Sequence, residues 1–380
     1  MRHLYLLTFL FLSFSCSSRS QEKERIETAQ VEKERPPLST DTLHLLFVGD
    51  LMQHTGQIKA AQTAHGYDYS SYFTYVKKEI EKADIAIGNL EVTLGGQPYT
   101  GYPAFSAPDE YAKAIQTAGF DVLLTANNHS LDRGKKGLER TLKILGELQM
   151  THTGTFKDSI ERKQSYPLLI EKKGFRIALL NYTYGTNGLK VTPPNIVNYI
   201  DTLIIAQDIE RAKALNPHTI IACMHWGNEY QSLPSKQQKY LSTWLLSKGV
   251  NHIIGSHPHV VQPIEVQASA DSLDRHLVVY SLGNFVSNMS ARKTDGGLIV
   301  NLKLAKDSTV RMIHSDYMMV YTGRPSRTYK KNHILYPVQM PIDSIPVNIR
   351  NSLNIFKKDA RSLFKTHNIG IKEQNIFEKK

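Results

Sequence analysis

Short apolar runs alternate, along the first part of the chain, with stretches that carry apolar residues at helical spacing. Runs of strand length occupy residues 43–48, 85–87 and 120–125, and helical patterns occupy residues 108–118 and 134–150. Strands that are almost continuously apolar are typical of sheets buried on both faces. The alternation therefore predicts an α/β fold with substantial parallel content.

The middle and end of the chain continue this pattern. Residues 166–182 are predicted to form a β-hairpin, and residues 184–198 a polar loop over one face, which is a candidate substrate-binding segment. Further predicted helices span residues 58–64, 72–82, 201–215, 235–248 and 344–365. Further predicted strands span residues 219–224, 250–254, 276–281, 297–304 and 310–320.

Polar side chains follow five of the predicted strands at the point where each strand ends. They are Asp50, Glu91, Asn128 with His129, His225, and His257 with His259. A single acidic residue or histidine at such a position is usually a cap or a hydrogen-bonding group. The carboxyl ends of parallel strands, however, meet at one edge of a sheet, where ligands bind. We therefore expect these side chains to form one functional site.

The mixture of oxygen and imidazole donors in this set suits a divalent transition metal such as Mn, Fe or Zn. The donors suffice for one metal, or for two metals about 3.5–4 Å apart as in two-metal phosphoesterases. The candidate metal ligands are Asp50, Glu91, Asn128, His225, His257 and His259. His129 is a candidate general acid for a leaving oxygen, and Asp132 is a candidate hydrogen-bond partner that orients it.

The composition is that of a globular protein, with 41% hydrophobic and 21% charged residues in a chain of 380. The formal net charge of +11 favours anionic partners, such as a phosphorylated substrate or an anionic polymer. The basic residues are scattered and form no block interleaved with aromatic residues, so no nucleic-acid partner is expected.

The N-terminal residues resemble a bacterial lipoprotein signal. Residues 4–14 form an apolar run too short to span a bilayer, and Ser15-Cys16 follows as in a lipobox. We expect residues 1–16 to be this signal, with lipidated Cys16 holding the protein to a membrane of the cell envelope, outside the cytoplasm. The alternative is an ordinary secretory signal with a chance cysteine. Residues 17–41 are polar and charged, as in a flexible tether.

Six motifs, in this order, resemble those of the CapA family, the poly-γ-glutamate capsule biosynthesis proteins. They are Gly49-Asp50-Leu51-Met52; Asn89-Leu90-Glu91; Ala126-Asn127-Asn128-His129 with Asp132 and Gly134; His225-Trp226-Gly227 with Glu229-Tyr230; Gly255-Ser256-His257-Pro258-His259; and Tyr280-Ser281-Leu282-Gly283-Asn284-Phe285. The resemblance covers residues 43–300 and includes neither the tether nor the C-terminal part.

This resemblance implies the fold of the calcineurin-like metallophosphoesterases, a four-layer α/β/β/α sandwich with a dimetal site. It assigns His129 to the general-acid position and implies work at the membrane alongside poly-γ-glutamate synthase subunits. The positions it assigns to metal ligands are those of Asp50, Asn128, His225, His257 and His259. We accordingly expect a CapA-like metallophosphatase domain over residues 42–322 and a partly helical extension over residues 323–380.

Two motifs depart from the phosphoesterase pattern. His54 stands two positions later than the usual histidine after Asp50, and Gly88 is followed by Asn89, so that Glu91 is the nearest carboxylate. These departures leave open whether the site holds two metals, one or none. Three functions remain: a metal-dependent phosphoesterase, an enzyme acting on an amide bond of the polymer, and a non-catalytic subunit that binds the polymer or its synthase.

Overall fold

The computed structural model describes residue 1 and residues 41–268, 275–307, 309–326 and 333–374. The chain divides into two compact units, residues 1–38 and 39–380, and every helix and strand named below belongs to the second. The expected lipoprotein signal and tether lie outside the described residues, apart from Met1 and Asp41. No helix within the described ranges has the length and apolar character needed to cross a membrane.

The larger of the two main sheets has nine strands in the described part of the chain. Its main path runs through β18 (Ile334–Pro337), β17 (Val310–Gly323), β16 (Gly296–Lys306), β1 (Thr42–Leu51), β4 (Ile85–Leu90), β5 (Val122–Leu124) and β6 (Thr151–Thr153). The two strands off this path are β15 (Asn284–Val286), beside β1, and β19 (Lys372–Glu373), beside β17. From β1 to β6 the strands are parallel, so their carboxyl ends share one edge.

The second main sheet also has a parallel centre. Its order is β13 (Ile264–Ala268), β14 (Arg275–Val279), β12 (His252–Ser256), β11 (Thr219–His225), β9 (Phe175–Thr183) and β8 (Leu168–Lys172). The strands from β14 to β9 are parallel, and the β8–β9 pair is the predicted hairpin. Two short pairs lie apart from these sheets: β2 (Gln62–Thr63) with β3 (Gly66–Tyr67), and β7 (Thr155–Phe156) with β10 (Ile196–Val197).

Helices connect the strands of both sheets. They are α2 (Thr55–Ala61), α3 (Lys77–Ile80), α4 (Asp109–Thr117), α5 (Gly134–Glu147), α6 (Ser159–Ser165), α7 (Thr202–Ala214), α8 (Lys236–Ser247), the short 3₁₀ helix η1 (Ile342–Ser344) and α9 (Val347–His367). Asp201 caps α7 as its position predicts, because its side chain accepts from the backbone N of Leu203 and Ile204. Ser235 forms a capping box with Gln238 at the start of α8.

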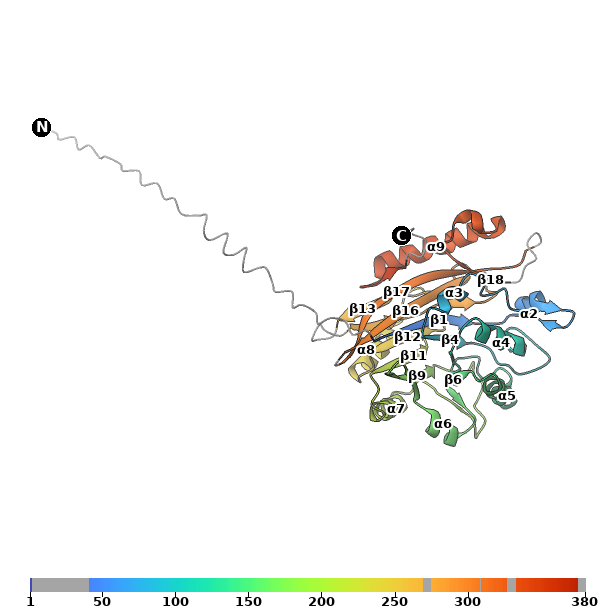
Figure 1. Ribbon diagram of the computed structural model, residues 1–380, viewed down its shortest axis with the longest axis horizontal. Coiled ribbons are helices and arrows are strands. Elements are labelled where there is room, and N and C mark those ends of the chain that lie inside the picture. Colours follow the sequence, from blue (N-terminus) through green and yellow to red (C-terminus); the bar gives the residue numbers. More distant parts are fainter. Residues whose placement is uncertain (2–40, 269–274, 308, 327–332, 375–380) are drawn as a thin grey trace. The chain divides into compact units, whose positions relative to one another are not determined.

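The two sheets pack face to face, because alternate residues of their strands point into one apolar core. Phe47 of β1 packs in this core with Ile177 of β9 and Ile221 of β11. The intervening residues face outward: Leu46 of β1 shares a second cluster with α4, and Leu180 of β9 shares a third with α7 and α8. Figure 1 shows these helices outside the strands. The predicted four-layer α/β/β/α sandwich is therefore confirmed.

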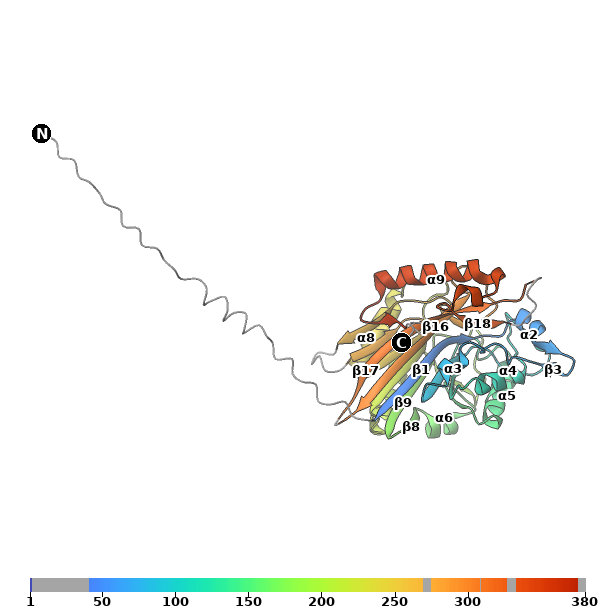
Figure 2. The ribbon, with the colours of Figure 1, turned by 45° about the horizontal axis from the view of Figure 1, so that its top comes forward.

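The residues after 322 add to the same core. β18 pairs with β17, and α9 packs Leu353, Phe356 and Phe364 into the cluster between the sheets, beside Tyr317 and Tyr321 of β17. Figure 2 shows α9 lying along the larger sheet, beside β16 and β18. The segment expected as a C-terminal extension is thus partly helical and closes the apolar core.

The helix predicted over residues 72–82 is regular only in α3. Before it, backbone hydrogen bonds join Tyr72 N to Tyr69 O and Val76 N to Phe73 O, which are turns of three-residue spacing. The apolar side chains of this stretch still point into one cluster. Burial every three or four residues fits such turns as well as an α-helix, so the pattern alone could not separate them.

Candidate metal centre

The structure brings side chains from both sheets into one buried cluster, where the carboxyl ends of the parallel strands meet. Asp50 lies near the end of β1, Glu91 follows β4, and His225 is the last residue of β11. His257 and His259 follow β12. Each of these five residues is at most 3% exposed. Two carboxylates from one sheet therefore face three imidazoles from the other.

Asn89, which stands where the phosphoesterase pattern has an aspartate, lies between the two carboxylates. Its Nδ2 donates to Asp50 Oδ1 at 2.8 Å and to Glu91 Oε2 at 3.2 Å. Its Oδ1 accepts from Asn127 Nδ2 at 3.3 Å, which favours this orientation of the amide. Asn89 thus holds one oxygen of each carboxylate. The other two, Asp50 Oδ2 and Glu91 Oε1, have no hydrogen-bond partner among the described residues.

Glu91 lies at the centre of the cluster. Its Oε1 is 3.8 Å from His225 Nε2, 3.8 Å from His259 Nε2 and 4.0 Å from His129 Nε2. Burial, together with the charge of Asp50, raises the pKa of Glu91 well above its usual value. A carboxylate in such surroundings is expected to take up a proton or a cation, because an isolated buried charge is costly.

The turn after β12 aims two histidine rings at this cluster. His257 and His259 have φ angles of +100° and +58°, in the left-handed region that favours glycine, and such strain is kept where a site needs the geometry. His259 Nδ1 lies 3.0 Å from Asn284 Oδ1 and 3.3 Å from Asp50 Oδ2, so its Nε2 faces Glu91. His257 Nδ1 is buried and has no hydrogen-bond partner among the described residues.

The three imidazoles differ in ionisation because their surroundings differ. Burial lowers the pKa of His257 to about 3 and holds the pKa of His225 well below its usual value, and neighbouring imidazoles add to both effects. Burial also opposes the charge on His259, but Asp50 outweighs it and raises the pKa of that ring. His225 and His257 are therefore neutral at pH 7, the form in which imidazole binds a metal.

Asn128 orients His225 from the first sheet. Its Oδ1 lies 2.9 Å from His225 Nε2, and its Nδ2 donates to Asn187 Oδ1 at 3.2 Å. The ring of Tyr184 stacks on His225, with 6.4 Å between centroids, and lies 4.4 Å from the ring of His257. Tyr184 and Asn187 belong to the polar loop at residues 184–198, so this loop borders the cluster.

His129 lies on the other side of Glu91 and contacts Asp132. Its Nδ1 is 2.8 Å from Asp132 Oδ2, which also accepts from Phe105 N at 2.8 Å. The ring of His129 meets that of Phe105 edge to face, with 4.6 Å between centroids. These contacts fix the ring and leave Nε2 directed toward the cluster.

Two sets of described side chains have ligand atoms within 4.8 Å of one another. One set is Asp50, Glu91 and His225, and the other is Glu91, His257 and His259. Glu91 belongs to both, and three members offer a buried atom without a hydrogen-bond partner: Asp50 Oδ2, Glu91 Oε1 and His257 Nδ1. Buried polar atoms are rarely left so, and carboxylates with imidazoles suit a divalent transition metal. The residues therefore fit the metal expected from the sequence.

His54, the late histidine of the first motif, belongs to neither set. It caps α2, where its backbone N donates to Gln57 Oε1 at 2.8 Å. Its ring packs edge to face on Phe105, with 5.1 Å between centroids, and burial lowers its pKa to about 4. His54 therefore supports the packing behind His129.

Sequence reasoning assigned no role to several polar residues around the cluster. Asn89 and Asn284 lie within the quoted motifs, and Asn284 pairs in register with Asp50. A polar residue at a strand end beside a candidate ligand is a signal that could have found both. Tyr184 and Asn187 lie in a loop already expected near the substrate, but nothing in its sequence distinguishes them from their neighbours.

Known sequences similar to this chain include capsule biosynthesis proteins. The family model of the bacterial capsule synthesis protein PGA_cap matches residues 44–289. The capsule biosynthesis protein CapA of Bacillus anthracis is 29% identical over 299 residues, which cover 75% of this chain and 69% of the relative. The PGA biosynthesis protein CapA of Bacillus subtilis (strain 168) is 30% identical over 288 residues, which cover 72% and 70%.

Solved structures that resemble this chain include phosphoesterases and nucleotidases. The calcineurin-like phosphoesterase YfkN of Bacillus subtilis aligns with 86% of this chain and 98% of its own, at 12% identity and a TM-score of 0.41. The NAD nucleotidase NadN of Haemophilus influenzae aligns with 88% and 57%, at 11% identity and a TM-score of 0.45. The family match includes every candidate site residue from Asp50 to His259. The chain therefore belongs to the PGA_cap family of bacterial capsule synthesis proteins, as its motifs predict.

Proposed function

We propose that this protein is a metal-dependent hydrolase that serves capsule or anionic-polymer biosynthesis from a membrane of the cell envelope. The family supports the biosynthetic role, since two relatives are named capsule biosynthesis and PGA biosynthesis protein. The observation that carries the hydrolase is the meeting of two buried ligand sets, Asp50 with Glu91 and His225, and Glu91 with His257 and His259, whose ligand atoms lie within 4.8 Å of one another in each set. Buried carboxylates and imidazoles placed in this way suit a divalent transition metal.

The ion would be Mn, Fe or Zn, as one or two ions. The residues that would hold it are Asp50, Glu91, His225, His257 and His259, and Asn128, the sixth predicted ligand, lies beside them with its Oδ1 2.9 Å from His225 Nε2. When bound, such an ion polarises a phosphoryl or carbonyl oxygen and makes water a better nucleophile. Asn89, Asn128 and Asn284 orient the ligands through hydrogen bonds. The bond broken is a phosphoester or an amide of the polymer.

His129 would carry the proton of this reaction. Its Nδ1 is held by Asp132 Oδ2, so Nε2 is the atom that offers a proton to the leaving group. Asp132 keeps the ring aimed at the cluster through this contact.

The test of the hydrolase uses the full-length protein in detergent. We expect Mn, Fe or Zn by elemental analysis and cleavage of bis(4-nitrophenyl) phosphate, and His257→Ala should lose both while keeping the wild-type circular dichroism spectrum. His314→Ala, at a half-exposed histidine of β17, is the matched control and should keep both. A protein that binds no metal and stays inactive with each of the three ions refutes the hydrolase. Polymer binding that survives chelation would then identify an accessory subunit.

Cys16 and the synthase subunits are the proposed links to the membrane. We expect the wild-type protein in the membrane fraction, labelled by a fatty-acid analogue, and pulled down with a membrane synthase subunit. Cys16→Ser should abolish the label and release the protein into the soluble fraction. Retention of the Cys16→Ser protein in the membrane with unchanged labelling would exclude lipidation at this residue.

A further inference from the structure

Four exposed residues lie beside or near the buried metal centre, and we call them its mouth. Tyr102, Tyr184 and Tyr230 are 73%, 47% and 52% exposed, and the side chain of Glu229 is 40% exposed. Large aromatic side chains that stay exposed beside a functional site are common binding surfaces. None of these four has a role in the proposed hydrolysis.

Each tyrosine lies against a different part of the centre. The ring of Tyr184 lies 4.4 Å from that of His257, and the ring of Tyr230 lies 6.2 Å from that of His259. Tyr102 lies 6.3 Å from Phe105, the ring that contacts His129. Tyr184 and Tyr230 therefore border the centre directly, and Tyr102 lies one ring farther out, close enough to Tyr230 to act on its ionisation.

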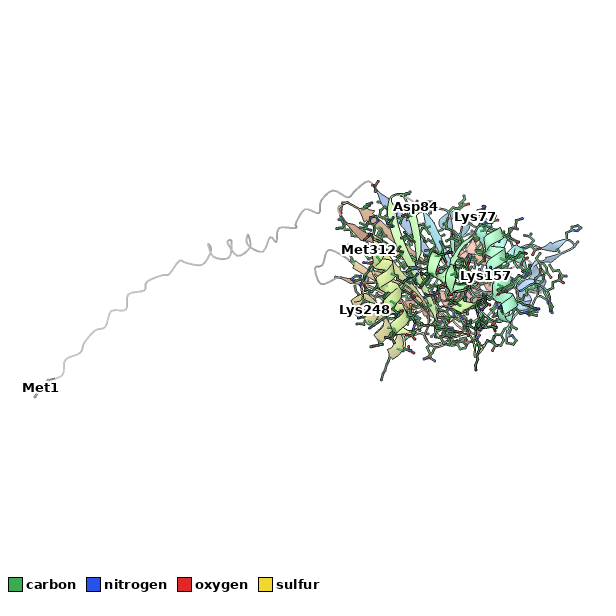
Figure 3. All side chains as sticks on the ribbon, turned by 90° about the horizontal axis from the view of Figure 1, so that it is seen from below. Met1, Lys77, Asp84, Lys157, Lys248 and Met312 are labelled. Carbon is green, nitrogen blue, oxygen red and sulfur yellow. The ribbon has the colours of Figure 1, made fainter. Side chains whose placement is uncertain are left out.

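Glu229 makes the mouth of the centre acidic. Its Oε1 is 4.0 Å from His259 Nε2, which is the one ion-pair contact that Glu229 makes within the described residues. Burial and then Glu229 raise the pKa of both Tyr184 and Tyr230. Lys77, Lys157 and Lys248, labelled in Figure 3, lie apart from one another, and Lys293 Nζ donates to Ser232 Oγ at 3.1 Å without an ion-pair contact to Glu229.

The backbone holds this mouth in place. Tyr230 N donates to Pro258 O at 2.8 Å, which joins the Glu229 loop to the histidine turn. Gln262, which is fully buried, donates from Nε2 to Gln231 O at 2.8 Å and accepts from Gln238 Nε2 at 2.8 Å. A carboxylate and aromatic faces fixed in this way form a pre-organised subsite.

We propose that Glu229 and the three tyrosines bind an alkylammonium group of the substrate, beside the anionic or carbonyl group that the metal centre attacks. Tyrosine faces attract a cation, and an acidic side chain without a lysine or arginine partner strengthens that attraction. The side-chain carboxylates of an anionic polymer would be repelled by Glu229. The mouth therefore selects an ammonium-bearing end or headgroup of the substrate over the middle of a polyanion. This inference rests on the proposed metal centre for the neighbouring group.

The test measures binding, so that it does not depend on turnover. The full-length, metal-loaded protein is titrated calorimetrically with 2-aminoethylphosphonate and with n-propylphosphonate, a pair that differs in the ammonium and has no hydrolysable ester. We expect the first to bind about tenfold more tightly. A second pair, a γ-glutamyl oligopeptide with a free or an acetylated amino end, distinguishes a polymer end from a phosphorylated headgroup.

Variants test whether the preference for the ammonium ligand depends on this subsite or on the charge of the protein as a whole. Glu229→Gln should bring the affinity ratio of the preferred pair close to one, and Tyr184→Leu should lower it severalfold. Glu210→Gln, on an exposed glutamate of α7, is the matched control and should keep the ratio. Metal content is measured for every variant and should be unchanged.

Three results would overturn the inference. One is equal affinity, or no binding, for the charged and neutral members of both pairs. Another is an unchanged ratio in Glu229→Gln. The third is loss of metal in Glu229→Gln, which would make Glu229 a ligand of the ion. Failure of the proposed hydrolysis is a different result, since it appears as absent turnover while the binding preference remains.

Discussion

Asp50 and Glu91 are both buried carboxylates at strand ends, but their neighbours drive their ionisation in opposite directions. Burial opposes the charge on each, yet the His259 ring keeps the pKa of Asp50 below its usual value. Glu91 has Asp50 beside it, and its pKa is raised. The pair therefore carries less than its full negative charge until a cation arrives, which limits the cost of keeping two acids in one buried site.

Asp132 is expected to act on the proton held by His129 and not on the metal. Asp132→Asn should lower kcat on the order of 100-fold with little change in KM, because the amide no longer holds the His129 ring through a carboxylate contact to Nδ1. Metal content should stay at the wild-type level, since Asp132 belongs to neither ligand set. Steady-state kinetics with elemental analysis checks this, and a drop in metal content would contradict it.

His252, at the start of β12, gives the stability of the fold a dependence on pH. It is buried and accepts a hydrogen bond from Leu277 N at 3.1 Å, and burial lowers its pKa to about 3. Below its unfolded pKa of about 6.5 the unfolded chain binds a proton that the folded chain does not. The contribution of neutral, buried His252 to the free energy of unfolding is fully present above pH 6.5. It is lost as pH falls toward 3, at about 1.4 kcal/mol per pH unit.

The variant His252→Asn tests this contribution. Between pH 7.5 and pH 5.0 its free energy of unfolding should fall by about 2 kcal/mol less than that of the wild type. Urea titrations at the two pH values measure the difference. His314→Asn, at an exposed histidine, should behave as the wild type does, and a wild-type slope in His252→Asn would contradict the assignment.

The candidate ligands could be found from the sequence because each follows an apolar run, and parallel strands bring such ends together. The residues that orient them could not be found in this way. Asn284 contacts His259 because β15 runs beside β1, a pairing between distant parts of the chain that no local pattern encodes. Asn187 meets Asn128 from a loop without periodicity. Side-chain hydrogen bonds of this kind depend on tertiary geometry.

At the scale of elements, the cap of α7 is expected to contribute to global stability because the helix packs in a core. Asp201→Ala should lower the free energy of unfolding by about 1 kcal/mol, since Ile205 and Ile209 of α7 are buried. Asp158→Ala removes the equivalent cap from α6, which buries no residue, and should cost less than half as much. Denaturant titration compares the two, and equal losses would contradict this explanation.

Helix α6 also shows the limit of reading elements from periodicity. It has a good N-cap in Asp158 but buries no side chain, so no apolar spacing marks it in the sequence. By contrast, α4, α5, α7, α8 and α9 each bury a stripe and lie within or close to their predicted ranges. The spacing of apolar residues reports which side chains are buried. It therefore identifies a helix only where one face of that helix is buried.

At the scale of the whole molecule, α9 is expected to be required for the stability of the sandwich. Phe356→Ala should lower the free energy of unfolding by about 3–5 kcal/mol, because its ring is buried between the sheets. Ile355→Ala, at the neighbouring residue that is 42% exposed, should cost about 0.5 kcal/mol. Thermal and urea unfolding measure both. If Phe356→Ala and Ile355→Ala both lower the free energy of unfolding only slightly, then α9 does not unfold cooperatively with the sandwich.

The ion is expected to stabilise the entire domain, since its candidate ligands come from both sheets. At a free metal concentration 100-fold above its dissociation constant, binding adds about 2.7 kcal/mol to the free energy of unfolding. Chelation should therefore lower the melting temperature, and metal should restore it. His257→Ala should remove this response. A melting temperature that changes with neither chelator nor added metal would contradict stabilisation by the ion.

The division of the ligands between the sheets also determines when the ion can be captured. A chain that emerges during synthesis contains Asp50 and Glu91 long before it contains His225, His257 and His259. Two carboxylates alone are a poor site for a transition metal, and the imidazoles arrive in place only after β11 has paired with β9 and β12 with β11. Loading of the proposed site with metal would therefore be a late event that marks completed chains, and a truncated or half-assembled molecule would stay empty.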